Sequence, residues 1–267
     1  MADVLELDAN GPVAQGAPVK GIQKYRLADG REGWFKPADR KLNNIDKVRG
    51  MGMMVGGSAQ STEAQAFLPE REVAASLVAS ILIPHLAVQS ELAKRGMRRG
   101  VFMEHVQGSM AVESVDYEHA ELQLNADILR SIKPQLADLQ AFDYLIGNVD
   151  RHVENYMISV ARPLKVRAID NDLSFPSVAV GALAGVPASK FEGLPTAYTV
   201  VVAERITQMT EATLAEILRD VMAGAYLLDQ VVAQAQTRLR NLKADVAVKQ
   251  GRAAAPRMPS NYTNLRF

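Results

Sequence analysis

Short runs of apolar and aromatic residues, separated by turn signals, dominate the N-terminal part of the chain. Two of them flank a loop that contains Asp29-Gly30, and an Asp-Gly pair between such runs is typical of a β-hairpin. A further pair is joined by a basic turn at Lys94–Gly100. The pattern therefore predicts strands at Ile22–Leu27, Glu32–Phe35, Pro84–Gln89 and Val101–Val106.

Helical spacing of apolar residues appears first at Pro69–Leu82 and prevails after Val106. In Pro69–Leu82 the apolar positions are Ala74, Leu77, Val78 and Ile81. Later segments predict a helix that begins at Pro134 and stops at Gly147, and two more helices at about Thr210–Met222 and Ala225–Asp245. The runs Tyr156–Ser159 and Lys165–Ile169 predict a second hairpin.

Together these elements predict an α+β protein with a strand-rich part followed by a helical part. We divide the chain into a loose lead-in (1–20), a strand-rich part (21–106), a helical part (107–250) and a basic tail (251–267). The Gly- and Met-rich stretch 40–67 fits no packed element and is predicted to be a loop.

The composition is that of an ordinary globular protein. The chain has 267 residues, of which 48% are hydrophobic and 22% charged, and its formal net charge is zero. It contains no cysteine, which excludes disulfides, thiolate metal sites and cysteine nucleophiles within it. The acidic stretch 1–12 lacks the apolar core of a secretory signal, and the most apolar run, 178–188, is too short to span a bilayer. We therefore expect a cytoplasmic protein, or one delivered into a host cell if it is an effector.

Charge is unevenly distributed along the chain. The last thirty residues hold Asp245 as their only acid, against Arg238, Arg240, Lys243, Lys249, Arg252, Arg257 and Arg266. Such a run is either a solvated helix end, where cations suit the helix dipole, or a surface for an acidic partner or an anionic membrane. No nucleic-acid partner is expected.

Two polar motifs carry the candidate chemistry. Leu145–Asn155 reads LIGNVDRHVEN, and Ala168–Pro176 reads AIDNDLSFP. Phosphoryl transfer from ATP needs a carboxylate at the acceptor hydroxyl, and an amide oxygen and a second carboxylate on magnesium. Asp150, Asn155 and Asp170 supply these groups in that chain order.

The two motifs together resemble the catalytic and metal loops of the phosphatidylinositol 3/4-kinase-like superfamily. They are most similar to those of the type II phosphatidylinositol 4-kinases and the plant gamma-type kinases, some of which phosphorylate proteins. The resemblance runs from about Trp34 to Pro176. It implies a two-lobed, protein-kinase-like fold with ATP and Mg²⁺ between a strand-rich N-lobe and a helical C-lobe.

The resemblance also implies roles for residues upstream. Phe35-Lys36-Pro37 is similar to the strand whose lysine aligns the nucleotide phosphates, which assigns that task to Lys36. Arg71-Glu72-Val73-Ala74-Ala75 is similar to the helix whose glutamate pairs with the lysine, which favours Glu72, with Glu70 as the alternative. No glycine-rich phosphate loop precedes Lys36 at the spacing that protein kinases use.

The strand that ends at Val106 resembles the hinge of kinases, where adenine binds to main-chain groups. By position, the Glu104 carbonyl and the Val106 N–H face the adenine edge, with Met103 behind it. His152 lies inside the Asp-Arg-His motif and is either a catalytic residue or a structural one, whereas Arg151 is interpreted as ordering the loop.

Three functions are compatible with these residues. The first is an ATP- and magnesium-dependent Ser/Thr protein kinase, acting as a bacterial effector or regulator. The second is a phosphoinositide kinase, and the third is a pseudokinase scaffold that binds partners without turnover. The intact set of Asp150, Asn155 and Asp170 disfavours the scaffold. The lack of the cysteines that type II lipid kinases palmitoylate disfavours the lipid kinase.

Overall fold

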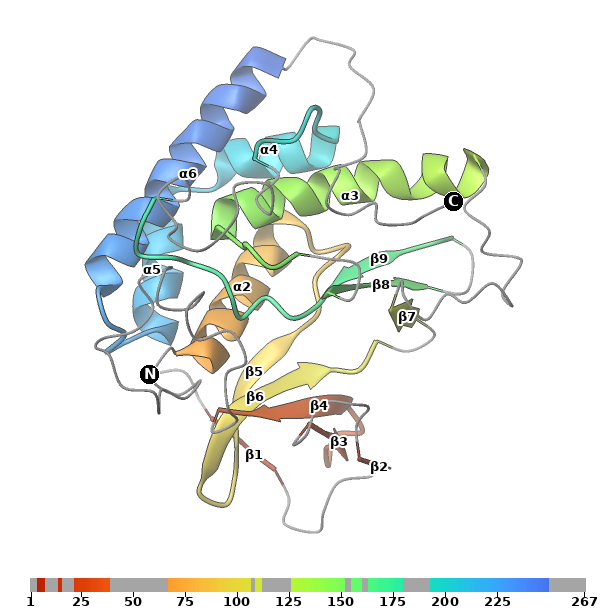
Figure 1. The fold of residues 1–267 in the computed structure, drawn as a ribbon, viewed down its shortest axis with the longest axis vertical. Helices are drawn as coiled ribbons and strands as arrows, with labels where there is room; N and C mark the ends of the chain where they lie inside the picture. The colour runs from red at the N-terminus through yellow and green to blue at the C-terminus, as the bar shows by residue number, and fades with distance from the viewer. Residues whose placement is uncertain are drawn as a thin grey trace.

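The computed structural model describes residues 4–7, 14–15, 22–38, 67–106, 109–111, 126–151, 155–159, 163–179 and 193–249. A strand-rich part lies at the bottom of Figure 1, and a helical part lies above it. The predicted α+β architecture, a strand-rich part followed by a helical part, is confirmed. Residues 40–66 of the predicted loop and the basic tail lie outside the described residues.

The strand-rich part is one sheet of six strands in the order β1-β5-β6-β4-β3-β2. Neighbouring strands are antiparallel, except that β1 runs parallel to β5. The bounds are β1 Leu5–Glu6, β2 Ala14–Gln15, β3 Gln23–Arg26, β4 Glu32–Pro37, β5 Ser90–Arg95 and β6 Arg98–Glu104. The predicted hairpin around Asp29-Gly30 is therefore confirmed as β3–β4, with Gly30 at φ 87°.

The strand predicted at Pro84–Gln89 is wrong. This stretch begins with a turn in which the N–H groups of Leu86 and Ala87 both donate to the Ile83 carbonyl, at 2.8 and 3.0 Å. The strand starts only at Ser90, whose N–H donates to the Ser76 hydroxyl at 2.9 Å. The basic turn is also shorter than predicted, because Arg95 still pairs with Arg98 and only two residues connect β5 to β6.

Helix α2 (Leu68–Leu82) joins the two parts, since it contacts β5 and β6 on one side and α3, α4 and α5 on the other. The helix was predicted, and of the four apolar positions that indicated it Ala74 and Val78 are fully buried, whereas Leu77 and Ile81 are each 40% exposed. The buried side includes Arg71, Glu72 and Ser76. Apolar spacing could not reveal that side, since its polar residues bond to distant segments.

The described residues of the helical part form four helices and a small antiparallel sheet in the order β7-β8-β9. Their bounds are α3 Ala126–Ile146, α4 Val200–Gln208, α5 Glu211–Val221, α6 Leu228–Lys249, β7 Ser109–Ala111, β8 Tyr156–Ser159 and β9 Val166–Ala168. The predicted hairpin is confirmed as β8–β9, and Thr210 caps α5 by accepting from the Thr213 N–H at 3.0 Å. None of the described helices is both long and apolar enough to cross a membrane.

Helix α3 is longer than predicted, because Pro134 lies inside it rather than at its start. A proline inside a helix removes one backbone hydrogen bond and commonly kinks or ends it, but here the helix continues on both sides of Pro134. The predicted C-terminal stop at Gly147 is confirmed, with a left-handed φ of 66°. This stop directs the chain out of α3 and into the Asp150 motif.

Candidate active site

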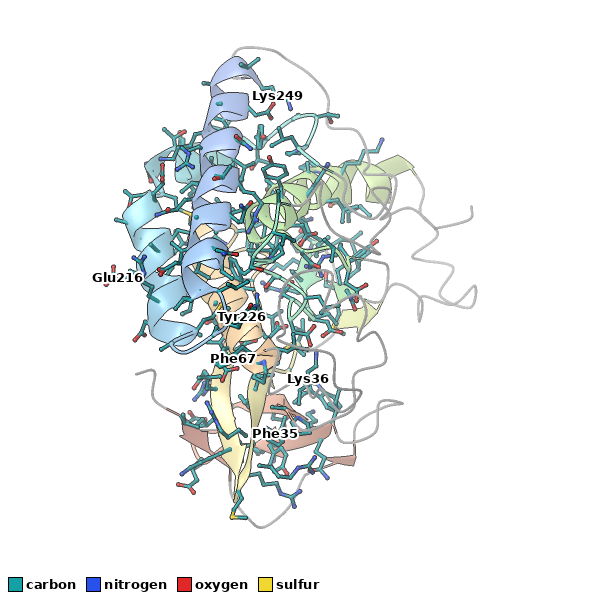
Figure 2. All side chains as sticks on the ribbon, turned by 60° about the vertical axis from the view of Figure 1, so that its left-hand side comes forward. Phe35, Lys36, Phe67, Glu216, Tyr226 and Lys249 are labelled. Atoms are coloured by element: carbon teal, nitrogen blue, oxygen red, sulfur yellow. The ribbon has the colours of Figure 1, made fainter. Side chains whose placement is uncertain are left out.

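Lys36 connects the sheet to the segment that follows β9. It is 7% exposed, and its ammonium forms ion pairs with Asp170 and Asp172, which lie 134 and 136 residues away along the chain. Strand alternation explains the direction, because the preceding Phe35 faces the small apolar cluster with Tyr25 and Phe102. Figure 2 shows Phe35 and Lys36 on opposite sides of β4, with Lys36 toward the helical part.

Glu72 is buried on α2 and binds the same segment. The backbone N–H of Asn171 donates to its Oε2 at 2.5 Å, and Nδ2 of Asn171 lies 3.2 Å from its Oε1. Burial raises the pKa of Glu72 to about 7; the Lys36 ammonium opposes this shift, whereas the charges of Asp172 and Asp170 add to it. The sequence assigned Glu72 to Lys36, but the hydrogen bonds of Glu72 go to Asn171, and Lys36 pairs with two aspartates.

Glu70, the alternative partner predicted for Lys36, binds a different residue. Its carboxylate accepts from the Arg99 guanidinium at 3.1 Å, at the edge of β6. Between the two glutamates, Arg71 is 1% exposed, and its Nη1 donates to the carbonyls of Ser174 at 2.9 Å and of Phe175. Desolvation lowers the pKa of Arg71 to about 9. Successive residues of α2 thus hold both ends of the segment from Asn171 to Phe175.

Arg151 holds that segment from the other side. Its guanidinium makes a paired contact with the Asp143 carboxylate of α3, with Nε and Nη2 at 3.0 and 2.9 Å. Nη1 also donates to the carbonyls of Asn155 and Ile169, the latter at 2.8 Å, and Nη2 donates to Oδ1 of Asn171 at 2.5 Å. The structural role predicted for Arg151 therefore has a concrete form.

Asp150 and Asn155 lie beside these contacts. The Asp150 N–H donates to Oδ1 of Asn148 at 2.9 Å, and its carbonyl accepts from Nδ2 of Asn155 at 2.8 Å. Asn155 is 4% exposed, and the Ile169 N–H donates to its carbonyl at 3.2 Å. Because Nδ2 of Asn155 donates to the Asp150 carbonyl, the side-chain oxygen of Asn155 is turned away from that carbonyl.

The segment after β9 has an unusual backbone at both ends. Asp170 has φ 56° and Phe175 has φ 53°, in the left-handed region that residues other than glycine rarely adopt. Such conformations persist when surrounding contacts fix them, and they concentrate at functional sites. Here the contacts come from Lys36, Arg71, Glu72 and Arg151.

The remaining predicted site residues are distributed as follows. Met103 and Glu104 end β6, with Met103 paired to Trp34 and the Glu104 N–H donating to the Gln89 carbonyl at 2.9 Å. Val106 is partly buried just after the strand, and the N–H of the intervening His105 donates to the Glu32 carbonyl at 2.8 Å. His152 lies outside the described residues.

Sequence reasoning missed four polar residues here: Arg71, Asp143, Asn171 and Asp172. Asp172 carried a usable signal, since it is a second carboxylate only two residues after Asp170 in the same motif. The other three are recognised only by contacts with residues that are distant in sequence or by their burial. Among the described residues, no group of three or more His, Cys, Asp or Glu side chains lies close enough together to hold a metal ion.

No known protein-family pattern matches the chain, and no curated protein sequence matches it. Among solved structures, the chain is similar to the crystal structure of a Helicobacter pylori proinflammatory kinase, CtkA. The sequence identity is 12% and the TM-score is 0.49, and the match covers 89% of this chain and 97% of that one.

Proposed function

We propose that the protein is an ATP- and magnesium-dependent Ser/Thr protein kinase with a phosphatidylinositol 3/4-kinase-like catalytic core. One observation carries the proposal: Lys36 of β4 meets Asp170 and Asp172 across 134 and 136 residues, beside the loop that holds Asp150 and Asn155. A strand lysine opposite a metal-binding carboxylate is what phosphoryl transfer needs to align the nucleotide phosphates.

The donor set suits magnesium. Mg²⁺ prefers hard oxygen ligands and is commonly held by one or two carboxylates together with substrate phosphates. Asp170 and Asp172 offer two carboxylates that already share one cation, the Lys36 ammonium, and Asn155 offers an amide oxygen. When bound, the metal would neutralise charge on the transferred phosphoryl group.

In this proposal each of the site residues has a definite task. Lys36 binds the α- and β-phosphates, and Asp150 orients the acceptor hydroxyl and accepts its proton. The Glu104 carbonyl and the Val106 N–H bind the adenine edge, with Met103 behind it. Asn148 and Asn155 hold the main chain of Asp150 on both sides, which suits a base that has to meet its proton at hydrogen-bond distance.

A protein hydroxyl is the acceptor that we favour over a phosphoinositide. The chain contains no cysteine, whereas the type II lipid kinases that its motifs resemble typically anchor through a palmitoylated cysteine-rich loop. The choice between the two acceptors calls for a direct comparison under the same conditions.

The test uses labelled ATP and magnesium, with cell lysate in one reaction and phosphoinositide vesicles in another. We expect label in protein, and Asp150→Ala should transfer phosphate at least about a hundredfold more slowly while binding ATP normally, as loss of a positioned base implies. Asp229→Ala, on the exposed start of α6, is the matched control and should keep full activity. Label only in lipid would select the lipid kinase; no transfer at all, or full activity of Asp150→Ala, would refute the proposal.

A further inference from the structure

A continuous chain of buried side chains connects α2 to the loop of Asp150. Glu72 accepts from the backbone N–H and the side-chain amide of Asn171, whose Oδ1 accepts from Arg151. Arg151 in turn forms its paired contact with Asp143. Glu72, Asn171, Arg151 and Asp143 are each no more than 5% exposed, and we call them the buried relay.

The relay continues to Asp150 through one more residue. The Asp143 carboxylate lies 3.4 Å from Nδ2 of Asn148, and its backbone carbonyl accepts from the Asn148 N–H at 3.0 Å. Oδ1 of Asn148 then accepts the Asp150 N–H at 2.9 Å. One end of the hydrogen-bond chain therefore lies on α2, and the other end fixes the residue assigned as the base.

Asn171 is the central member because an amide both donates and accepts. Its donors face the Glu72 carboxylate and its acceptor faces the Arg151 guanidinium, so both neighbours are satisfied at once. Aspartate would present a second acceptor to Glu72, and leucine would offer neither group. Partly satisfied buried networks are costly, so the position tolerates neither change well.

We propose that Asn171 is a positioning residue that couples the placement of α2 to the geometry of Asp150, Asp170 and Asp172, an inference that rests on the proposed kinase function. Asn171 lies between the two aspartates in sequence, so anything that moves it moves both. Glu72 places it relative to α2, and Arg151 places it relative to the catalytic loop. A shift of α2 would thereby reach the metal ligands and the base together.

The first test measures coupling between the two ends of the relay by urea unfolding. Glu72→Gln and Asp143→Asn are made singly and together, in the natural chain and in Asn171→Leu. Residues of one network deviate from additivity, whereas independent sites add. In the natural chain, we expect the unfolding constant of the double variant to deviate at least about fivefold from the product of the two single effects. In the Asn171→Leu chain, the same deviation should be less than about twofold.

The second test measures turnover. Asn171→Leu should lower kcat at least about tenfold, as expected when reacting groups lose alignment. The loss should fall on kcat and leave the KM for ATP within about threefold, because Lys36 and the adenine-binding groups of β6 are unchanged. Asn171→Asp, which presents a second acceptor to Glu72, should lower kcat as well.

The two tests separate failure of the relay from failure of the proposed function. Absence of kinase activity in the natural protein would refute the proposed function, and the unfolding cycle would still decide whether the relay exists. Additive effects of Glu72→Gln and Asp143→Asn, or coupling that survives in Asn171→Leu, would refute the relay. Normal kcat in an Asn171→Leu protein that folds would refute the positioning role.

Discussion

Replacement of Glu72 by glutamine tests the electrostatics of the site through stability and does not depend on any substrate. The side chain is 2% exposed, and burial raises its pKa from an ordinary 4.5 to about 7. Glutamine has nearly the same shape and stays uncharged at every pH, so it mimics the protonated form of Glu72. A comparison of the two proteins across pH isolates the titration of this one group.

The sign follows from proton binding. Between pH 4.5 and about 7 the folded protein holds the Glu72 proton more tightly than the unfolded chain does, so the stability contributed by this group is present at low pH and is lost as the pH rises through about 7. At about 1.4 kcal/mol for each pH unit, the interval corresponds to roughly 3 kcal/mol. Relative to Glu72→Gln, the natural protein should therefore lose roughly 3 kcal/mol of unfolding free energy between pH 4.5 and 8.

Urea unfolding at several pH values, from 4.5 to 8, measures the difference directly, since titrating groups that do not face Glu72 act equally in both proteins. Glu216→Gln is the matched control, because Glu216 lies on the surface of α5 (Figure 2) and its replacement should give a difference that does not vary with pH. A difference that stays constant within about 1 kcal/mol for Glu72→Gln, or that grows in favour of the natural protein as the pH rises, would show that the environment of Glu72 has been misjudged.

Two further substitutions test the contacts that place the site. Gly100→Ala should destabilise the protein by about 2–3 kcal/mol and weaken ATP binding, because the added Cβ would lie 2.8 Å from Cα of Pro37 and displace the strand that carries Lys36. Gly96→Ala lies in the same hairpin at φ 55° with open space around it. It should cost about 1–2 kcal/mol from backbone strain alone and leave ATP binding intact. If the Gly100→Ala and Gly96→Ala variants bound ATP equally well, the proposed displacement of Lys36 would be wrong. Arg71→Met should cost about 2–4 kcal/mol in urea unfolding, since two buried carbonyls lose their donor. Arg219→Met, at an exposed pair on α5, should change stability by less than about 0.5 kcal/mol, and a similar loss in both would contradict a special role for Arg71.

Local patterns were sufficient to predict much of the fold. The β3–β4 hairpin, α2, the stop of α3 at Gly147 and the β8–β9 hairpin each depend on signals within a few residues. The positions of Asp150, Asn155 and Asp170 near one another follow from the same kind of signal, because the β8–β9 hairpin returns the chain to where it began. Whether these residues carry catalysis stays a prediction.

Errors arose where an interaction with a distant segment outweighed the local pattern. The apolar positions of α2 indicated the helix, but they did not indicate that Arg71 and Glu72 are buried, because the carbonyls and amides after β9 provide their partners. The pairing of Lys36 with Glu72 stays a prediction: the Lys36 charge acts on the pKa of Glu72, while its ammonium forms ion pairs with Asp170 and Asp172. Such choices are decided by which groups the fold brings into reach.

The polar contacts of the site define its geometry more than they stabilise the fold. Bringing Lys36 to Asp170 closes a long loop, and the free energy for closure comes from the apolar cluster that α2 shares with α3, α5 and α6. A typical hydrogen bond adds only about 1 kcal/mol of net stability, yet it fixes direction in a way that apolar contact does not. Substitution of a core residue such as Leu145 should therefore lower stability before it alters the site. Substitution of Asn171 should misdirect Asp170 and Asp172 in a protein that still folds, since the cluster that closes the loop does not include it.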